Sequence, residues 1–184
     1  MAAICHAATP IFVMTKRGRA CSHRLPAAPM AAVACALLSF SSPALAASEK
    51  VRITGLGDVA FGSIGNLGAD SVRSQSLCLY SSSTTNGYSV TAIGTGPGGS
   101  FELSSGSLSL PFEVQWSSSA GQSSGAQVSP NVPLTGQVTT ATQQTCSSGP
   151  ATSASLIVVL RSSALSSAMA GTYNGSITLL VGPE

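Results

Sequence analysis

Histidine and charge are scarce in most of this chain, and their scarcity excludes several functions. The sequence has 184 residues and two histidines, His6 and His23, which both precede Ala47. From Ala47 to Glu184 there are four Lys or Arg and six Asp or Glu residues, a net charge of −2. Without histidine, that part can form no Ser-His-Asp triad, Cys-His pair or imidazole metal ligand. Four scattered cations cannot track a phosphate backbone, so we expect no nucleic-acid binding.

Long apolar runs are also missing outside one segment near the N-terminus. A positive region at 16–24 precedes an apolar stretch at 30–40, which small residues follow: Ala44 and Ala46 stand at positions −3 and −1 before Ala47. This three-part pattern predicts a secretory signal peptide cleaved after Ala46. The apolar stretch has about 11 residues, whereas a bilayer span needs roughly 20. We therefore expect an exported protein without a membrane anchor.

The same pattern divides the chain into two parts. Residues 1–46 are predicted to be the signal peptide, and residues 47–184 have the length of one domain. Because the positive region lies well inside the chain, Met14 is an alternative start.

Only two cysteines, Cys78 and Cys146, remain in residues 47–184. In an exported domain such a pair predicts one disulfide. The bridge would close a loop of about 70 residues and add about 4 kcal/mol of stability in the chain-entropy model. The alternative, two buried free thiols, stays open because Cys146 lies in a polar loop.

Residues 108–116 show the clearest strand pattern. Five large side chains alternate with smaller or polar ones and would share one face: Leu108, Leu110, Phe112, Val114 and Trp116. This period of two predicts a half-buried strand. Pro111 has no N–H, so we expect an edge strand or a bulge there.

Further short strands are predicted between turn signals, at 58–64, 72–80, 88–93, 101–103, 132–138, 155–160 and 173–181. The stretch 155–160 is apolar on both faces, as in a central strand. One or two helical turns fit 162–170. Many short strands without an amphipathic helix predict an all-β sandwich.

No motif supports catalysis, a cofactor or a metal. The glycines at 94–99 match G-x-G-x-x-G, but a strand-like segment follows where a dinucleotide site needs a helix. Glu102 and Glu113 could face each other across a hairpin, yet nothing apolar surrounds them to raise a pKa as a glycosidase pair requires. Asp58 and Asp70 are too few for a calcium site. Trp116 could stack on a sugar, but its phase with the core residues favours burial. We expect a non-enzymatic protein.

Short motifs along the domain share their spacing with one family. They are Asp58-x-x-Phe61-Gly62, Cys78-x-Tyr80, Tyr88-x-Val90-x-Ala92-x-Gly94, Phe101-x-Leu103, Leu110-Pro111-Phe112-x-Val114 and Gly171-x-Tyr173-x-Gly175-x-Ile177-x-Leu179-x-Val181. On these motifs, which span residues 51–184, the chain resembles the spore coat protein U domain family. That family includes pilin subunits of archaic chaperone–usher fimbriae in Gram-negative bacteria.

The resemblance implies an immunoglobulin-like, pilin-type sandwich that lacks its last strand and is open to a donor strand. A partner would add its strand to the groove by main-chain hydrogen bonds and alternate side chains. The implied partners are a periplasmic chaperone, an outer-membrane usher and neighbouring fimbrial subunits, and the implied location is the periplasm and then the cell surface. From their place on the final strand, the candidate groove residues are Tyr173, Ile177, Leu179 and Val181.

One departure from the family favours a tip, terminating or stand-alone subunit over a repeating shaft subunit. Cleavage after Ala46 leaves only residues 47–50 ahead of the first strand, too few to act as a donor strand. The alternative function is a self-complete immunoglobulin-like binding module, with a glycan as one type of ligand. Such a module would need no partner strand.

Overall fold

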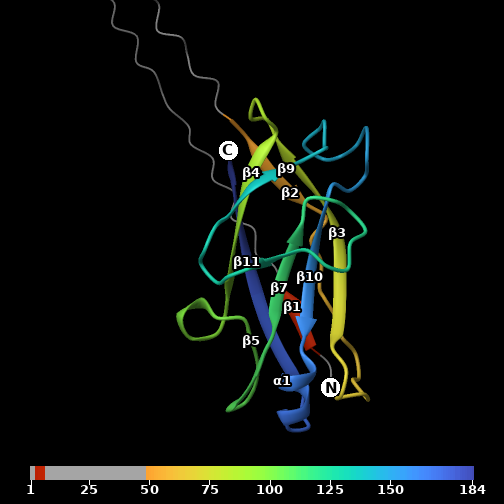
Figure 1. Cartoon of the computed structure of the whole chain (residues 1–184), viewed down its shortest axis with the longest axis vertical. Helices are drawn as coiled ribbons and strands as arrows, with labels where there is room; N and C mark the ends of the chain where they lie inside the picture. Colours follow the sequence, from red (N-terminus) through yellow and green to blue (C-terminus); the bar gives the residue numbers. More distant parts are fainter. Residues whose placement is uncertain (1–2, 7–48) are drawn as a thin grey trace, which may run out of the picture. The chain divides into compact units, whose positions relative to one another are not determined.

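The structure is a computed structural model that describes residues 3–6 and 49–184 (Figure 1). The predicted cleavage site at Ala44, Ala46 and Ala47 lies outside the described residues, as does the predicted signal peptide apart from 3–6. The cleavage site and the domain boundary therefore stay predictions.

Two sheets of mainly antiparallel strands make up the fold. The first is connected in the order β6 (Leu108–Pro111), β5 (Glu102–Ser105), β11 (Tyr173–Pro183), β4 (Gly87–Gly94) and β9 (Leu134–Val138), and the short strand β1 (Ala3–His6) also pairs with β11. The second has the order β2 (Val51–Thr54), β3 (Ser71–Ser81), β10 (Ala154–Leu160), β7 (Glu113–Ser117) and β8 (Ala126–Val128). This arrangement confirms the predicted all-β sandwich.

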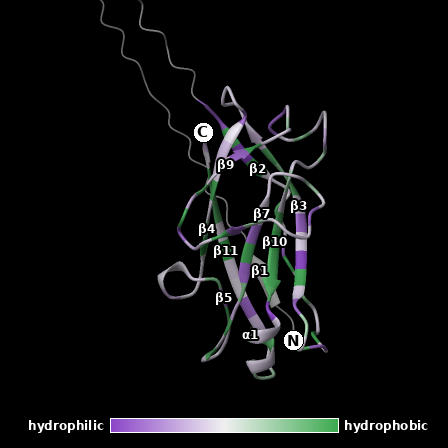
Figure 2. Cartoon of the chain, in the orientation of Figure 1, coloured by the Kyte–Doolittle hydropathy of each residue, from purple (hydrophilic) through white to green (hydrophobic). Residues whose placement is uncertain are grey.

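Strand β10 is the centre of the second sheet. It pairs with β3 on one edge and with β7 on the other, and every one of its residues is buried. Figure 2 shows it as a hydrophobic stretch in the middle of the fold. The double-sided apolar pattern of 155–160 thus predicted its position correctly.

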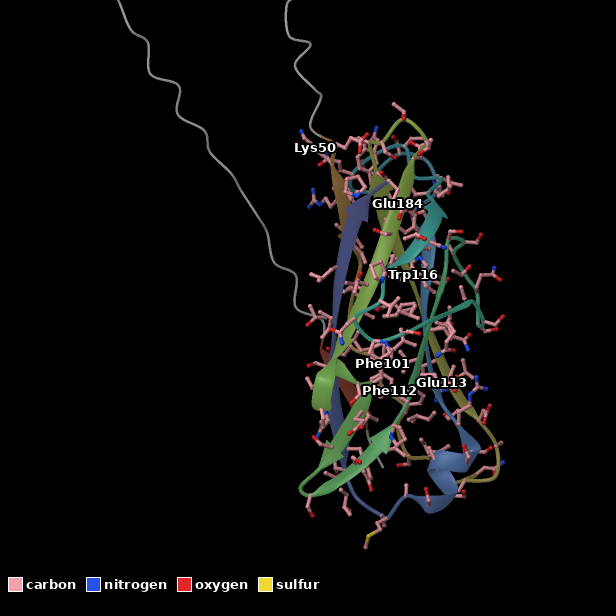
Figure 3. All side chains as sticks on the ribbon, turned by 60° about the vertical axis from the view of Figure 1, so that its left-hand side comes forward. Lys50, Phe101, Phe112, Glu113, Trp116 and Glu184 are labelled. Carbon is pink, nitrogen blue, oxygen red and sulfur yellow. A yellow bond between two sulfur atoms is a disulfide. The ribbon has the colours of Figure 1, made fainter. Side chains whose placement is uncertain are left out.

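Trp116 belongs to the core between the sheets, where Figure 3 shows it. It is 1% exposed, and its indole N–H donates a hydrogen bond of 3.0 Å to the hydroxyl of Tyr88. The two rings meet edge to face with centroids 6.3 Å apart. Burial and a satisfied N–H confirm the core assignment and leave no face of the ring for a sugar.

The alternating segment at 108–116 is not one strand, because the chain changes sheets at Phe112. Its first half is β6, the edge of the first sheet, and its second half is β7 in the second sheet. At the crossing, Phe112 N–H donates to the Phe101 carbonyl at 3.0 Å, and the two rings stack 5.7 Å apart. The side chains still alternate toward the core. The predicted set of inward-facing residues is therefore correct, whereas the prediction of one continuous strand is wrong.

Two other local predictions need correction. Residues 58–64 form no strand, although Val59 and Phe61 are buried. The glycine-rich chain bends here, with Gly62 at a φ of 67°. The Ser/Gly-rich segment 117–129, for which the sequence predicts only a connector between strands, contains β8. The one or two helical turns predicted within 162–170 are found as α1 (Ser162–Ser167), whose Leu165 is buried.

The two cysteines are joined. Cys78 on β3 and Cys146 in the loop after β9 form a disulfide with Cα atoms 6.0 Å apart. Together with Ala141 they make a small buried cluster, against which Tyr80 packs. The bridge therefore fixes the loop at 139–149 to the outer face of β3. Among the described residues, no helix is long and apolar enough to cross a membrane.

Candidate functional site

Strand β11 pairs with two strands along one of its edges. β4 pairs with it from Ile177 to Pro183, and β5 pairs with it at Asn174 through Ser104. Both strands lie on the same edge because the end of β4 touches the start of β5. A Cβ added to Gly94 would lie 3.0 Å from the Cα of Phe101. β5 therefore continues the line of β4 after a tight loop.

The opposite edge of β11, from Tyr173 to Pro183, is called the outer edge below. β1 runs parallel to β11 there and pairs Ala3–His6 with residues 173–176. Asn174 thus has strand partners on both sides, Ser104 of β5 and Ile4 of β1. Within residues 3–6 and 49–184, no strand pairs with the outer edge over 177–183. Its backbone groups there have no ladder partner from the described chain.

The four predicted groove residues lie on the inner face of β11. Tyr173, Ile177 and Leu179 are buried, and Val181 is partly buried against the same core. The hydroxyl of Tyr173 donates to the Met169 carbonyl at 2.9 Å. Their role as the lining of a groove stays a prediction, since each also serves the core.

On the side of the outer edge, the neighbouring chain segments belong to the second sheet or follow directly after its strand β2. β2, an edge strand of that sheet, lies next to β11, but the described residues show no backbone hydrogen bond between the two strands. After β2 the chain runs irregularly along β3, where the Arg73 guanidinium donates to the carbonyls of Ala60 and Phe61 at 3.3 and 3.2 Å. The buried side chains of Val59 and Phe61 close this side of the core. Among residues 3–6 and 49–184, no strand does so over this segment.

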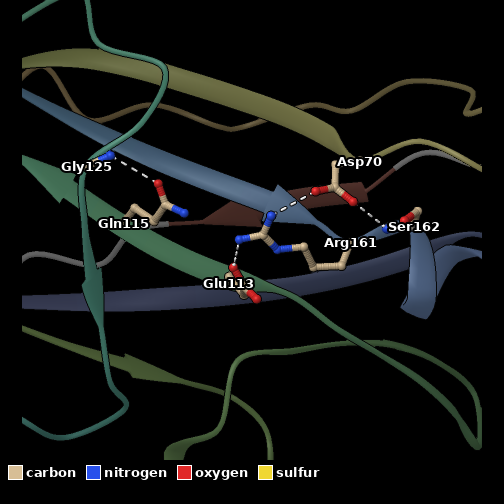
Figure 4. A network of polar contacts seen from close by, with 6 residues as sticks. All are labelled: Asp70, Glu113, Gln115, Gly125, Arg161 and Ser162. Atoms are coloured by element: carbon tan, nitrogen blue, oxygen red, sulfur yellow. Dashed lines mark hydrogen bonds and ion pairs between the residues drawn. The ribbon is translucent and has the colours of Figure 1, made fainter.

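A separate polar network lies at the end of β10 and holds three elements together (Figure 4). Arg161 bonds Asp70 at 2.8 Å and Glu113 at 2.5 Å. The second oxygen of Asp70 accepts the backbone N–H of Ser162 at 2.7 Å, at the start of α1. Sequence reasoning missed this network because its members are 48 to 92 residues apart.

The network shifts the pKa of two of its groups. The Ser162 N–H, and then the Arg161 guanidinium, hold the pKa of Asp70 below its ordinary value of 3.8. The hydrogen bonds that Arg161 donates to Glu113 and Asp70 raise the pKa of Arg161. Each shift favours the charged form, so the network is an ion-paired clamp. The lowered pKa of Asp70 is the opposite of what a general acid needs.

The two carboxylates that could have faced each other across a hairpin, Glu102 and Glu113, are not brought together. Glu102 lies opposite Pro111 in the hairpin of β5 and β6, whereas Glu113 is in the other sheet and bonds Arg161. The idea that Glu102 and Glu113 face each other is therefore wrong, because the chain changes sheets between them. In the described part of the chain, no group of three or more His, Cys, Asp or Glu could hold a metal ion.

Comparison with known proteins gives a structural likeness. No family model matches the sequence, and no curated protein matches it. A chain from a structure described as "Chaperone-tip adhesin complex is vital for synergistic activation of CFA/I fimbriae biogenesis" is similar at a TM-score of 0.47 and 18% identity. The likeness covers 74% of this chain and 41% of that chain, so this chain spans less than half of the chain that it matches.

Proposed function

We propose that this chain is an exported structural or adhesive subunit of a chaperone–usher type fimbria or related surface assembly, which gains a β-strand from a partner. The observation that carries the proposal is the outer edge of β11. In the described residues this edge accepts one short strand, β1, and has no strand partner over 177–183.

An unpaired edge in a two-sheet fold is a site for strand addition. Its N–H and C=O groups can form a ladder with another chain, and native proteins normally cover such an edge. Each hydrogen bond gained adds only about 1 kcal/mol net, but a strand that also inserts apolar side chains beside Ile177 and Leu179 would bury further surface. Strand addition here would extend the sheet and complete the core together.

Cleavage of the predicted signal peptide would open more of the outer edge to a partner strand. β1 belongs to the predicted signal peptide, residues 1–46, so cleavage after Ala46 would remove it. The outer edge would then have no strand partner over 173–176 either. A periplasmic chaperone would cover the edge first, and a neighbouring subunit would replace the chaperone at the outer-membrane usher. The protein would therefore pass from the periplasm to the cell surface.

Two adjacent residues of β11 allow a matched test. Val181 is partly buried and faces the core, whereas Leu180 is 43% exposed on the opposite face. Full-length chains with Val181→Arg or Leu180→Arg would be exported together with a tagged cognate chaperone. We expect Val181→Arg to reduce the recovered complex at least about fivefold, because a buried arginine is excluded from a dry strand interface, and Leu180→Arg to leave it unchanged.

Stability must be measured in the same experiment. Circular dichroism and thermal unfolding of both variants show whether Val181→Arg merely prevents folding, and Val181→Ala supplies a milder change at the same position. Equal capture of the chaperone by all three variants, with all of them folded, would contradict strand addition at β11.

A further inference from the structure

A polar hollow lies at the end of the sandwich where the disulfide is. It has a volume of about 400 Å³ and is formed by the end of β3, the turn before β4 and the loop that follows β9. Seven of its eight lining residues have a hydroxyl or amide side chain, and none is charged. Ligand pockets usually have volumes of roughly 300–1,000 Å³ but mostly apolar walls. This hollow has the size of a ligand site and a different chemistry.

Three lining side chains offer unused hydrogen-bonding groups. They are the phenol of Tyr80, the amide of Asn86 and the hydroxyl of Thr140. Within the described residues, none of these groups has a hydrogen-bond partner. Asn86 and Thr140 are exposed and Tyr80 is partly buried. The amide supplies donors and an acceptor, and each hydroxyl supplies both. Tyr80 adds an aromatic face at low conformational cost.

The floor of the hollow is held rigidly by buried hydroxyl groups. Ser81 donates to the Gly87 carbonyl at 2.7 Å, and Thr139 donates to the Leu79 carbonyl and accepts the Ala141 N–H. Ser153 bridges both backbone groups of Leu79. Of the five buried polar residues of the described chain, all except Ser155 belong to this region.

The backbone above this floor is fixed as well. The disulfide holds the 139–149 loop to β3, and the Thr139 N–H donates to the Asn86 carbonyl at 3.0 Å. Asn86 has a left-handed φ of 54°, which asparagine tolerates better than most residues. The three groups with unused hydrogen-bonding capacity are therefore presented from a pre-organised frame, which lowers the entropic cost of binding.

We propose that this hollow binds a neutral, polyhydroxylated ligand, such as one hexose unit of a glycan. Uncharged walls give no attraction to phosphate, carboxylate or ammonium groups. Hydroxyl and amide walls leave an apolar ligand without compensation for their desolvation. A sugar hydroxyl donates and accepts as water does, and its apolar C–H face can lie on Tyr80. The site is separate from Trp116, which is buried, and from the outer edge of β11.

The test uses protein exported from the full-length chain and a panel of neutral sugars: glucose, galactose, mannose and N-acetylglucosamine. Saturation-transfer NMR detects binding, and titration gives the affinity. Tyr80→Phe keeps the ring and removes the hydroxyl, and Asn86→Gly keeps the left-handed backbone and removes the amide. Thr135→Val is the matched control, since Thr135 is exposed on β9 and does not line the hollow.

We expect at least one sugar to bind, with about tenfold weaker affinity for Tyr80→Phe and Asn86→Gly and unchanged affinity for Thr135→Val. Thermal unfolding checks that each variant is folded. Binding of none of the four sugars would overturn the proposal. Binding that both hollow variants retain in full would also overturn it, because the ligand would then lie elsewhere.

Discussion

At the scale of single residues, Arg161 shows how a few charges can matter in a domain with so little charge. Its guanidinium connects β10 to Asp70 at the start of β3 and to Glu113 on β7. Asp70 in turn accepts the Ser162 N–H, so one carboxylate serves both the ion pair and the first turn of α1. These contacts tie together segments whose order along the chain gives no hint of their proximity.

The lowered pKa of Asp70 predicts a specific dependence of stability on pH. Because the folded-state pKa lies below 3.8, the unfolded chain takes up the proton first as pH falls. The stabilisation by Asp70 is therefore complete above about pH 5 and is lost as pH falls through the folded pKa. We expect Asp70→Asn to lower Tm at pH 7 and to have little effect at pH 2.

Thermal unfolding from pH 2 to pH 7 measures this difference, with Glu49→Gln at the exposed start of the described domain as the control. A difference in Tm between the parent and Asp70→Asn that is the same at both ends of the range would show that the ionised carboxylate is not the source of the stability.

At the scale of strands, we predict that the backbone amides at the outer edge of β11 are the least protected from hydrogen exchange in the first sheet. In the processed protein alone, amide hydrogens of 173–183 that point to this edge should exchange quickly, because no strand hydrogen-bonds them. Amides of β10, which pairs on both edges, should exchange slowly. Binding of a donor strand should slow exchange in β11 by at least about tenfold and leave β10 unchanged.

Hydrogen exchange followed by NMR or mass spectrometry resolves the two strands. Outer-edge amides of β11 that are as protected as those of β10 before any partner is added would contradict an open edge on β11.

The sequence predicted strands well where alternation is local and poorly where partners are distant. The period of two found β4, β10 and β11 within one or two residues. The same period could not show that Phe112 is a corner between sheets, because its side chain keeps the inward phase on both sides of the crossing. The 58–64 segment has strand-like apolar spacing, but its carbonyls bond the Arg73 side chain. No local pattern reveals such a contact.

For the candidate site too, features that depend on local alternation were predicted, and features that depend on distant partners were not. The four inward residues of β11 were found from alternation, whereas the pairing of β1 with this strand depends on residues that the signal pattern assigns to a removed segment. The polar hollow was also missed. In the sequence, its threonine, serine and asparagine residues are typical of loops. Only the disulfide and the register of the strands bring them together around Tyr80.

At the scale of the whole molecule, the disulfide is predicted to be a main contributor to stability. Cys78 and Cys146 are 68 residues apart, and closing a loop of that length restricts the unfolded chain by an amount worth up to about 4 kcal/mol. We expect the double variant Cys78→Ala/Cys146→Ala to lose about 2–4 kcal/mol in the free energy of unfolding by guanidinium denaturation. Dithiothreitol should destabilise the parent similarly.

The double variant also serves as the control for dithiothreitol, because a chain without the disulfide should keep the same stability when the reductant is added. A titration that finds two free thiols in the denatured, unreduced parent, together with equal stability of the parent and the double variant, would exclude the bridge.

If the sandwich needs a strand from a partner, the chain depends on that partner for its stability. Export of the full-length chain with and without a cognate periplasmic chaperone tests this dependence. Gel filtration and thermal unfolding are then applied to the purified product. We predict that most of the chain exported alone is degraded or aggregates, and that the monomer which remains unfolds at a lower temperature than the complex. With the chaperone, the chain should be recovered in high yield as a one-to-one complex. A monomer recovered without any chaperone in the same yield and with the same thermal stability as in the complex would show that the sandwich is already complete and would contradict strand addition.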